Sequence, residues 1–171
     1  ALAMNGKKVI MIFPGKLIVE RIFPADLAEY VTSYYKNKGV EFITGDSVKA
    51  IESDGEKKKL ITENGKTVIT DAVIAGIGIK PATALAESAG IITGNGILVD
   101  EFLKTNLESV YAAGDCANFY NPLLGKRIRV EHEDNANKMG RQAGRNMAGE
   151  NRPYDYLPFF YSDMFELGYE A

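Results

Sequence analysis

A short apolar stretch that ends in an acidic residue offers the first candidate for chemistry. Residues 109–113 have the composition of a buried strand, and Gly114 and Asp115 follow them directly. In open α/β sheets, ligands bind at the carboxyl edge of the strands, so the pattern predicts a carboxylate at a binding edge. The glycine lets the backbone approach a ligand closely, and Asp115 is suited to accept hydrogen bonds from a polyol. An ordinary loop aspartate is the alternative interpretation.

The second candidate lies at the start of a predicted helix over residues 132–148. Glu131 and His132, the only histidine of the chain, stand where the helix dipole favours negative charge on a ligand. For His132, a helix-start residue satisfied by its neighbours is the alternative. One helix face consists of small residues and methionine, which predicts close approach of a neighbouring element or a flat ligand. These residues are Ala136, Met139, Gly140, Ala143, Gly144 and Met147.

The elements before these candidates follow an α/β plan. Apolar runs predict strands over residues 9–13 and 40–43, and helical periodicity between them predicts a helix over 24–38. A buried strand is predicted over 72–75, and another over 97–99 precedes the Gly-Asp pair. The apolar face of the helix is predicted to contain Leu27, Tyr30, Val31, Tyr34 and Tyr35.

An antiparallel meander is predicted between these parts of the α/β plan. Its strands cover residues 47–53, 58–63 and 66–70. Asp54-Gly55 and Asn64-Gly65, which separate them, are strong signals of hairpin turns. The predicted fold class is therefore α/β with an inserted meander.

Composition places the chain among globular proteins and excludes several functions. The chain has 171 residues, of which 46% are hydrophobic and 25% charged, so a buried core is expected. A formal net charge of −3 argues against nucleic-acid binding. A single cysteine excludes a disulfide framework, and no metal site is expected. Since no apolar run approaches the roughly 20 residues of a membrane helix and no signal peptide is evident, we expect no membrane association and a cytoplasmic location.

Several strings occur in the order found in one protein family. Residues 105–116 closely resemble the second flavin-binding motif of the two-dinucleotide-binding-domain flavoproteins, the pyridine-nucleotide-dependent FAD oxidoreductases. Residues 71–81 look like the strand and Gly-Pro turn that close the NAD domain of that family, and 96–101 look like the strand before the Gly-Asp motif. Within the family, residues 13–14, 129–132 and 161–171 most resemble ferredoxin-reductase-like members and apoptosis-inducing factor.

This resemblance covers essentially the whole chain and implies its domain organisation. Residues 1–90 would be the C-terminal part of a Rossmann-like NAD(P)H-binding domain with the meander inserted. Residues 91–152 would be the returning, closing segment of an FAD-binding domain, and 153–171 the start of a C-terminal interface domain. Neither G-x-G-x-x-G loop of such proteins is present, and both ends look cut. The chain is therefore expected to be a fragment that neither holds flavin nor is active alone.

The resemblance also implies residues that bind FAD and NAD or NADP, without a catalytic side chain of its own. Asp115, with Gly114, would hold the ribitol chain of FAD. Glu131, His132 and Tyr161 would flank the flavin and the nicotinamide. Glu133, expected to lie near the flavin, stands where apoptosis-inducing factor has a histidine. Since this acid would lie near a site that becomes negative, the resemblance does not fix how the protein tunes the flavin. The residues expected to contact NAD(P) are Gly78, Arg21 and Glu170.

The choice between NAD and NADP depends on the loop after the first strand. A carboxylate near the end of the second strand of such domains usually binds the adenosine ribose. Here Gly15 stands where the relative has an acid, and Lys16 and Arg21 are basic. The missing acid weakens the expected preference for NAD, and the basic residues would tolerate the 2′-phosphate of NADP. The resemblance to this family still implies a slight preference of the protein for NAD over NADP.

The implied function is that of an FAD-dependent NAD(P)H oxidoreductase, which passes hydride to flavin and electrons on to a protein or small-molecule acceptor. One alternative is a disulfide reductase of the same superfamily, which would need a cysteine pair upstream, because Cys116 alone is expected to be a packing residue. Another is a redox-controlled interaction module of the apoptosis-inducing-factor type. A homodimer is one expected assembly.

Overall fold

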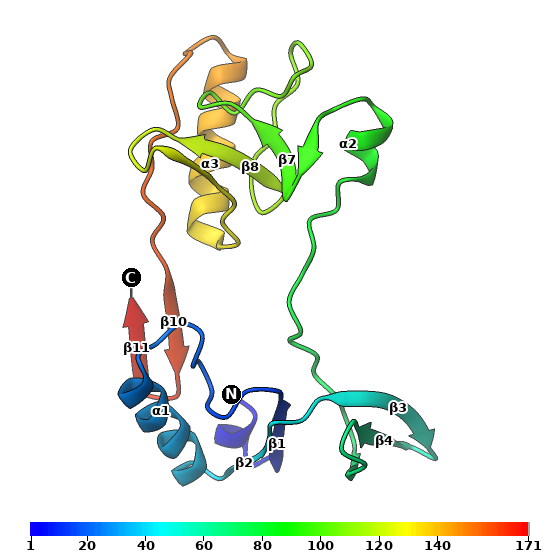
Figure 1. The fold of residues 1–171 in the computed structure, drawn as a ribbon. Helices are drawn as coiled ribbons and strands as arrows, with labels where there is room; N and C mark the ends of the chain where they lie inside the picture. The colour runs from blue at the N-terminus through cyan, green and yellow to red at the C-terminus, as the bar shows by residue number, and fades with distance from the viewer. Residues whose placement is uncertain (171) are drawn as a thin grey trace. The chain divides into compact units, whose positions relative to one another are not determined.

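The computed structural model describes residues 1–170, which form two compact units. The first unit runs from Ala1 to Ile77, and the second begins at Gly78. Figure 1 shows the elements of each unit in chain order. The division falls within an irregular segment over residues 72–83. The domain boundaries expected from the sequence, after residues 90 and 152, stay predictions.

Parallel pairing of two strands organises the first unit. A short 3-10 turn, η1 (Ala3–Asn5), ends at Gly6, and β1 (Val9–Phe13), α1 (Ala25–Asn37) and β2 (Val40–Thr44) follow. β1 and β2 pair in register from Val9 opposite Val40 to Phe13 opposite Thr44. The predicted strand, helix and strand are thus confirmed. A parallel pair needs such a crossover, because its strands must run in the same direction.

The predicted apolar face of α1 is partly wrong. Its buried residues are Ala28, Val31 and Thr32, whereas Leu27 and Tyr30 are 41% and 55% exposed. In the described chain, the sheet beside this helix has two strands. It therefore covers a narrower part of the helix surface than the apolar face that the periodicity predicted. Helical spacing predicts which side chains share a face, but the width of the opposing surface decides how many of them are buried.

The meander is confirmed. It consists of β3 (Val48–Asp54), β4 (Lys57–Thr62) and β5 (Thr67–Thr70), which pair antiparallel in that order. Gly55 and Gly65 in its turns have positive φ angles of 62° and 79°, a conformation that glycine adopts without steric cost.

The predicted buried strand over residues 72–75 is wrong. This segment is irregular, Ile74 is 77% exposed, and Ile77 farther along is 93% exposed. A buried strand requires a partner for its backbone hydrogen bonds and cover for its side chains. Within residues 1–170, no strand pairs with this segment. The segment therefore forms no strand in spite of its apolar composition.

The second unit is a mixed sheet with one long helix. Its elements begin with α2 (Ala84–Ser88), β6 (Thr93–Gly94) and β7 (Gly96–Val99). They continue with β8 (Ala117–Asn121), β9 (Lys126–Ile128), α3 (Glu133–Met147) and the hairpin strands β10 (Tyr161–Met164) and β11 (Leu167–Glu170). The sheet order is β6-β7-β8-β9, in which β7 and β8 are parallel. The expected strand over 97–99 and helix over 132–148 are confirmed.

The strand predicted over residues 109–113 is wrong, and the β8–β9 hairpin takes its place in the sheet. Residues 109–113 contribute one isolated bridge, between Tyr111 and Lys104. β8 was not predicted from the sequence, because its composition is largely polar. In the structure, Ala117, Phe119 and Asn121 are buried in strict alternation. That period of two is the usual signal of a strand with one covered face.

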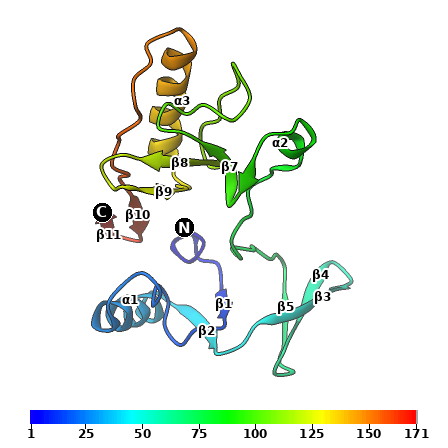
Figure 2. The ribbon, with the colours of Figure 1, turned by 45° about the horizontal axis from the view of Figure 1, so that its top comes forward.

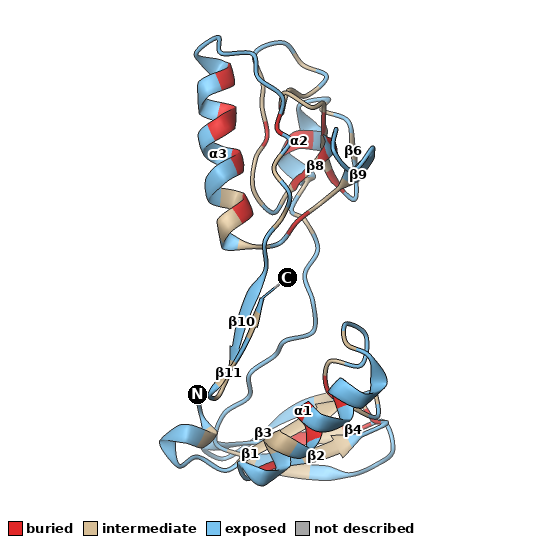
Figure 3. Cartoon of the chain, turned by 90° about the vertical axis from the view of Figure 1, so that its left-hand side faces the viewer, coloured by how far each residue is buried: buried red, intermediate tan, exposed pale blue. Residues whose placement is uncertain are grey.

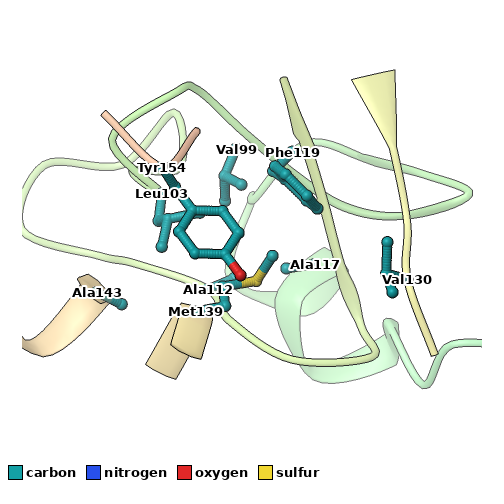
Figure 4. Packing of buried hydrophobic residues seen from close by; sticks show 9 residues of the cluster. All are labelled: Val99, Leu103, Ala112, Ala117, Phe119, Val130, Met139, Ala143 and Tyr154. Carbon is teal, nitrogen blue, oxygen red and sulfur yellow. The ribbon is translucent and has the colours of Figure 1, made fainter. Parts of the chain in front are cut away.

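Figures 2 and 3 show α3 beside this sheet, and one hydrophobic cluster lies in this unit. Phe119 and Tyr154 meet edge to face at 5.2 Å, and Figure 4 shows Met139 beside the Tyr154 ring. No helix of the described residues is long and apolar enough to cross a membrane. The cluster consists of Val99, Leu103, Ala112, Ala117, Phe119, Val130, Met139, Ala143 and Tyr154.

The small-residue face of α3 is only half covered. Met139 and Ala143 are buried, but Gly140, Gly144 and Met147 are exposed. The rest of the buried face is polar, with Asn135, Gln142 and Asn146. The Asn146 amide donates to the carbonyls of Phe102 and Arg152, both at 2.9 Å, so polar ties hold the helix in place.

A buried carboxylate links β2 to the meander in the first unit. Asp46 Oδ1 accepts hydrogen bonds from the backbone N–H groups of Ser47 (2.9 Å) and Asn64 (3.2 Å). Burial alone would raise the pKa of Asp46, but hydrogen bonds from the Thr62 hydroxyl and from these two N–H groups outweigh it, and the pKa is lowered.

The Asp46→Asn variant should therefore lose stability in a pH-dependent way. Because the folded-state pKa lies below the unfolded value, the charge stabilises the fold above the ordinary pKa of 3.8, and this contribution disappears as pH falls through the lower folded value. Urea unfolding between pH 3 and pH 7 should show a deficit at neutral pH that closes in acid. Asp54→Asn, at the exposed end of β3, is the matched control; an equal deficit at all pH values would contradict the prediction.

Candidate functional site

The Gly114-Asp115 turn lies against the first turns of α3. Gly114 has a φ of 83°, its N–H contacts Met139 Sδ at 3.2 Å, and a Cβ at this position would lie 3.9 Å from Ala136 Cβ. The expected close approach of the backbone to this helix is thus present. The predicted position at the carboxyl edge of a strand is wrong: the turn precedes β8, so Asp115 stands at the amino end of the parallel pair β7–β8.

The Asp115 carboxylate is exposed. Among residues 1–170 no group donates a hydrogen bond to it, whereas its backbone carbonyl accepts one from Arg129 Nη1 at 2.9 Å. The described chain therefore does not enclose this side chain in a cleft. What it supplies is a fixed backbone that carries a carboxylate with free acceptor capacity.

Arg129 is the functional residue that the sequence interpretation missed. Its side chain is 11% exposed and forms an ion pair with Glu131, Nη1 to Oε1, at 2.6 Å. Its Nε donates to Asn95 Oδ1 at 3.1 Å. With the bond to the Asp115 carbonyl, one guanidinium joins three separate loops, which the fixed fork of arginine donors permits. The one sequence signal for Arg129 was its place in residues 129–132, which resemble the family.

Gly96 makes room for this arrangement. A Cβ there would lie 2.5 Å from the Cys116 carbonyl oxygen and 2.8 Å from Arg129 Cδ. Its φ of 104° adds a second requirement for glycine. The Asn95-Gly96 turn thus leaves the space that the Arg129 side chain occupies.

His132 caps the start of α3. Its backbone is extended, and its Nδ1 accepts a hydrogen bond from the Asp134 N–H at 3.3 Å, which satisfies one free donor of the first turn. The imidazole meets the rings of Tyr161 and Phe160 edge to face at 4.9 Å and 5.3 Å. The structure thus brings the His132 and Tyr161 rings together, and that they flank the flavin and the nicotinamide stays a prediction.

Negative charges at the start of α3 are largely paired. The Asp134 carboxylate accepts a hydrogen bond from the Tyr156 hydroxyl at 2.6 Å and pairs with Lys138 at 3.2 Å. The hydrogen bond from Tyr156 is the main cause that lowers the pKa of Asp134, with Lys138 contributing. Glu131 is paired with Arg129, and Glu133 is exposed. The helix terminus therefore keeps its positive dipole for a ligand.

The remaining predicted residues are placed separately. Arg21 is exposed in the first unit, and Gly78, with a φ of 87°, begins the second. Glu170 lies opposite Tyr161 in the β10–β11 hairpin, and the Tyr161 ring contacts His132. That Arg21, Gly78 and Glu170 contact one nucleotide stays a prediction.

Sequence comparison assigns the family. The model of the pyridine nucleotide-disulphide oxidoreductase family matches residues 1–140, and the chain belongs to this family. Monodehydroascorbate reductase 3 of Arabidopsis thaliana is 41% identical, over 99% of this chain and 40% of that protein. The ferredoxin reductase subunit of a 5,5'-dehydrodivanillate O-demethylase from Sphingobium sp. is 37% identical, over 97% of this chain and 41% of that protein.

Solved structures agree with this assignment. A ferredoxin reductase from Rhodopseudomonas palustris superposes with a TM-score of 0.89 at 27% identity, over 98% of this chain and 42% of that one. Putidaredoxin reductase, in its covalent complex with putidaredoxin, gives 0.85 at 30% identity, over 95% and 40%. The chain thus spans about two fifths of these relatives. The expected family and Rossmann-like fold are confirmed, and the finer likeness to apoptosis-inducing factor stays a prediction.

Replacing Arg129 with methionine should loosen the site without unfolding the protein. The change removes the donor to the Asp115 carbonyl and leaves Glu131 unpaired. In the full-length protein we expect faster hydrogen–deuterium exchange across residues 114–117 and 130–132. Lys126→Met, an exposed cation on the same hairpin, is the control. Unchanged exchange in the Arg129 variant would show that the guanidinium does not hold these loops.

Proposed function

We propose that this chain is part of an FAD-dependent NAD(P)H oxidoreductase that delivers electrons to an acceptor. The observation that carries the proposal is the Gly114-Asp115 turn packed on the first turns of α3, with His132 and Tyr161 at the same helix start. Family membership over residues 1–140 supports the same assignment.

The residues present fit a flavin. Asp115 offers an acceptor to ribitol hydroxyls, and the nearby glycine keeps the approach open. The positive end of α3 favours the negative charge that reduction places on the flavin pyrimidine. When bound, FAD supplies the hydride and electron chemistry. The protein's own part is to hold the ribitol through Asp115 and to orient the ring system with His132 and Tyr161.

The Asp115→Asn variant tests this function in the full-length protein. Removal of a charge-assisted acceptor should weaken FAD binding at least tenfold, because such a bond contributes about 1.5–3 kcal/mol. Flavin absorbance after dialysis measures occupancy, and NADH or NADPH oxidation with a dye acceptor measures turnover. Glu108→Gln removes an equal charge from the preceding loop and should leave occupancy unchanged. A colourless wild-type protein that oxidises neither nucleotide would refute the function.

For the acceptor, we propose a protein with an acidic docking surface. A groove of about 250 Å³ between α3 and residues 152–156 is lined by Lys138, Arg141, Arg145 and Arg152, against the single acid Asp155. Arg145 pairs with Glu150 at 3.8 Å, but no carboxylate of the described chain pairs with Arg141 or Arg152. These free charges contrast with the net charge of −3 and favour an acidic partner.

The double variant Arg141→Gln/Arg152→Gln should raise the KM for a ferredoxin-type acceptor about tenfold at low salt and leave the rate with ferricyanide unchanged. The double variant Lys7→Gln/Lys58→Gln removes the same charge from exposed sites of the first unit and serves as control. Equal KM values in all three proteins, or reduction of monodehydroascorbate but of no protein acceptor, would contradict this proposal.

A further inference from the structure

The loop between β1 and α1 is fixed at the carboxyl edge of the β1–β2 pair. The Gly15 carbonyl accepts a hydrogen bond from the Gly45 N–H at 2.9 Å, and the Phe13 carbonyl accepts one from the Asp46 N–H at 3.3 Å. The end of β2 therefore holds the start of this loop in place. This edge of a parallel pair is where α/β proteins bind ligands.

The carboxylate of Glu20 lies over Gly15. Its Oε2 accepts hydrogen bonds from the N–H groups of Lys16 (3.0 Å) and Leu17 (2.9 Å). A Cβ at position 15 would collide with Glu20 Oε1, so the missing side chain of Gly15 is the room that this carboxylate fills. Oε1 accepts no hydrogen bond from the described chain and is available to a ligand.

The backbone before Glu20 is strained and anchored. Val19, a β-branched residue, has a φ of 56°, a conformation that such residues rarely adopt. Next to it, the Ile18 N–H donates to the buried Thr32 hydroxyl at 3.1 Å, and this hydroxyl donates to the Ala28 carbonyl at 2.7 Å. Strained residues persist where the surrounding structure holds them, and they cluster at ligand sites.

We propose that Glu20 binds the adenosine ribose hydroxyls of the dinucleotide, in place of an acid at position 15, and makes NAD(H) the preferred nucleotide. This inference rests on the proposed function. A carboxylate accepts hydrogen bonds from vicinal hydroxyls, whereas the 2′-phosphate of NADP(H) would meet a like charge there. Glu20 thus restores the preference for NAD that the missing acid at position 15 was expected to weaken.

The test compares the binding of NAD⁺ and NADP⁺ to the full-length protein by calorimetry, which does not depend on turnover. Glu20→Ala should weaken NAD⁺ binding at least tenfold and leave NADP⁺ binding unchanged or tighter. Glu20→Gln keeps an oxygen for the Lys16 and Leu17 N–H groups, so it separates loss of charge from collapse of the loop, and it should shift the NAD⁺/NADP⁺ ratio in the same direction. Glu29→Ala, an exposed acid on α1, is the control.

A rescue variant sharpens the test. Gly15→Asp combined with Glu20→Ala places a carboxylate in the vacated space and should recover much of the NAD⁺ affinity. Equal weakening of both nucleotides in Glu20→Gln, or tighter binding of NADP⁺ than NAD⁺ by the wild type, would overturn the role of Glu20. A wild-type protein that binds neither nucleotide would overturn the proposed function together with this inference.

Discussion

The guanidinium of Arg129 is the interaction on which the second unit's site depends. It holds the Asp115 carbonyl, the Asn95 amide oxygen and the Glu131 carboxylate, although these groups belong to three separate loops. Its own side chain is mostly buried, whereas the groups that it binds lie nearer the surface. The same residue fixes the Gly-Asp turn and neutralises the acid beside His132. The start of α3 therefore presents its dipole with little opposing charge.

Polar contacts replace much of the apolar packing expected of α3. Asn135 and Asn146 lie on its buried face, and Tyr154 donates to Asn135 Oδ1 at 3.0 Å. Such bonds specify one position of a helix more narrowly than apolar contacts do, because each buried group requires its own partner. Gly140 and Gly144 face open space within the described chain, in a protein whose relatives are more than twice as long. One face of α3 is thus held by polar contacts, and the face with the two glycines is not covered by the described chain.

Asp46 and Glu20 lie at the same edge of the first unit, but their different surroundings give the two carboxylates different roles. Asp46 is buried, and its Oδ1 accepts hydrogen bonds from two backbone N–H groups of the same unit, so it serves the fold. Glu20 also accepts hydrogen bonds from two backbone N–H groups through one oxygen, but its side chain is exposed and its other oxygen is free. The difference is access to solvent, which leaves one acid with acceptor capacity for a ligand. Composition alone does not distinguish the two.

The sequence by itself determined β1, α1, β2, the meander and α3, because periodicity, turn signals and caps act between residues close in the chain. Through family resemblance it also named His132 and Tyr161 as candidates for one site. Only the tertiary structure decided that residues 72–75 and 109–113 form no strand, since a strand exists through partners elsewhere. It likewise revealed Arg129 and Glu20. Their roles arise where side chains meet across loops, and no local pattern encodes such contacts.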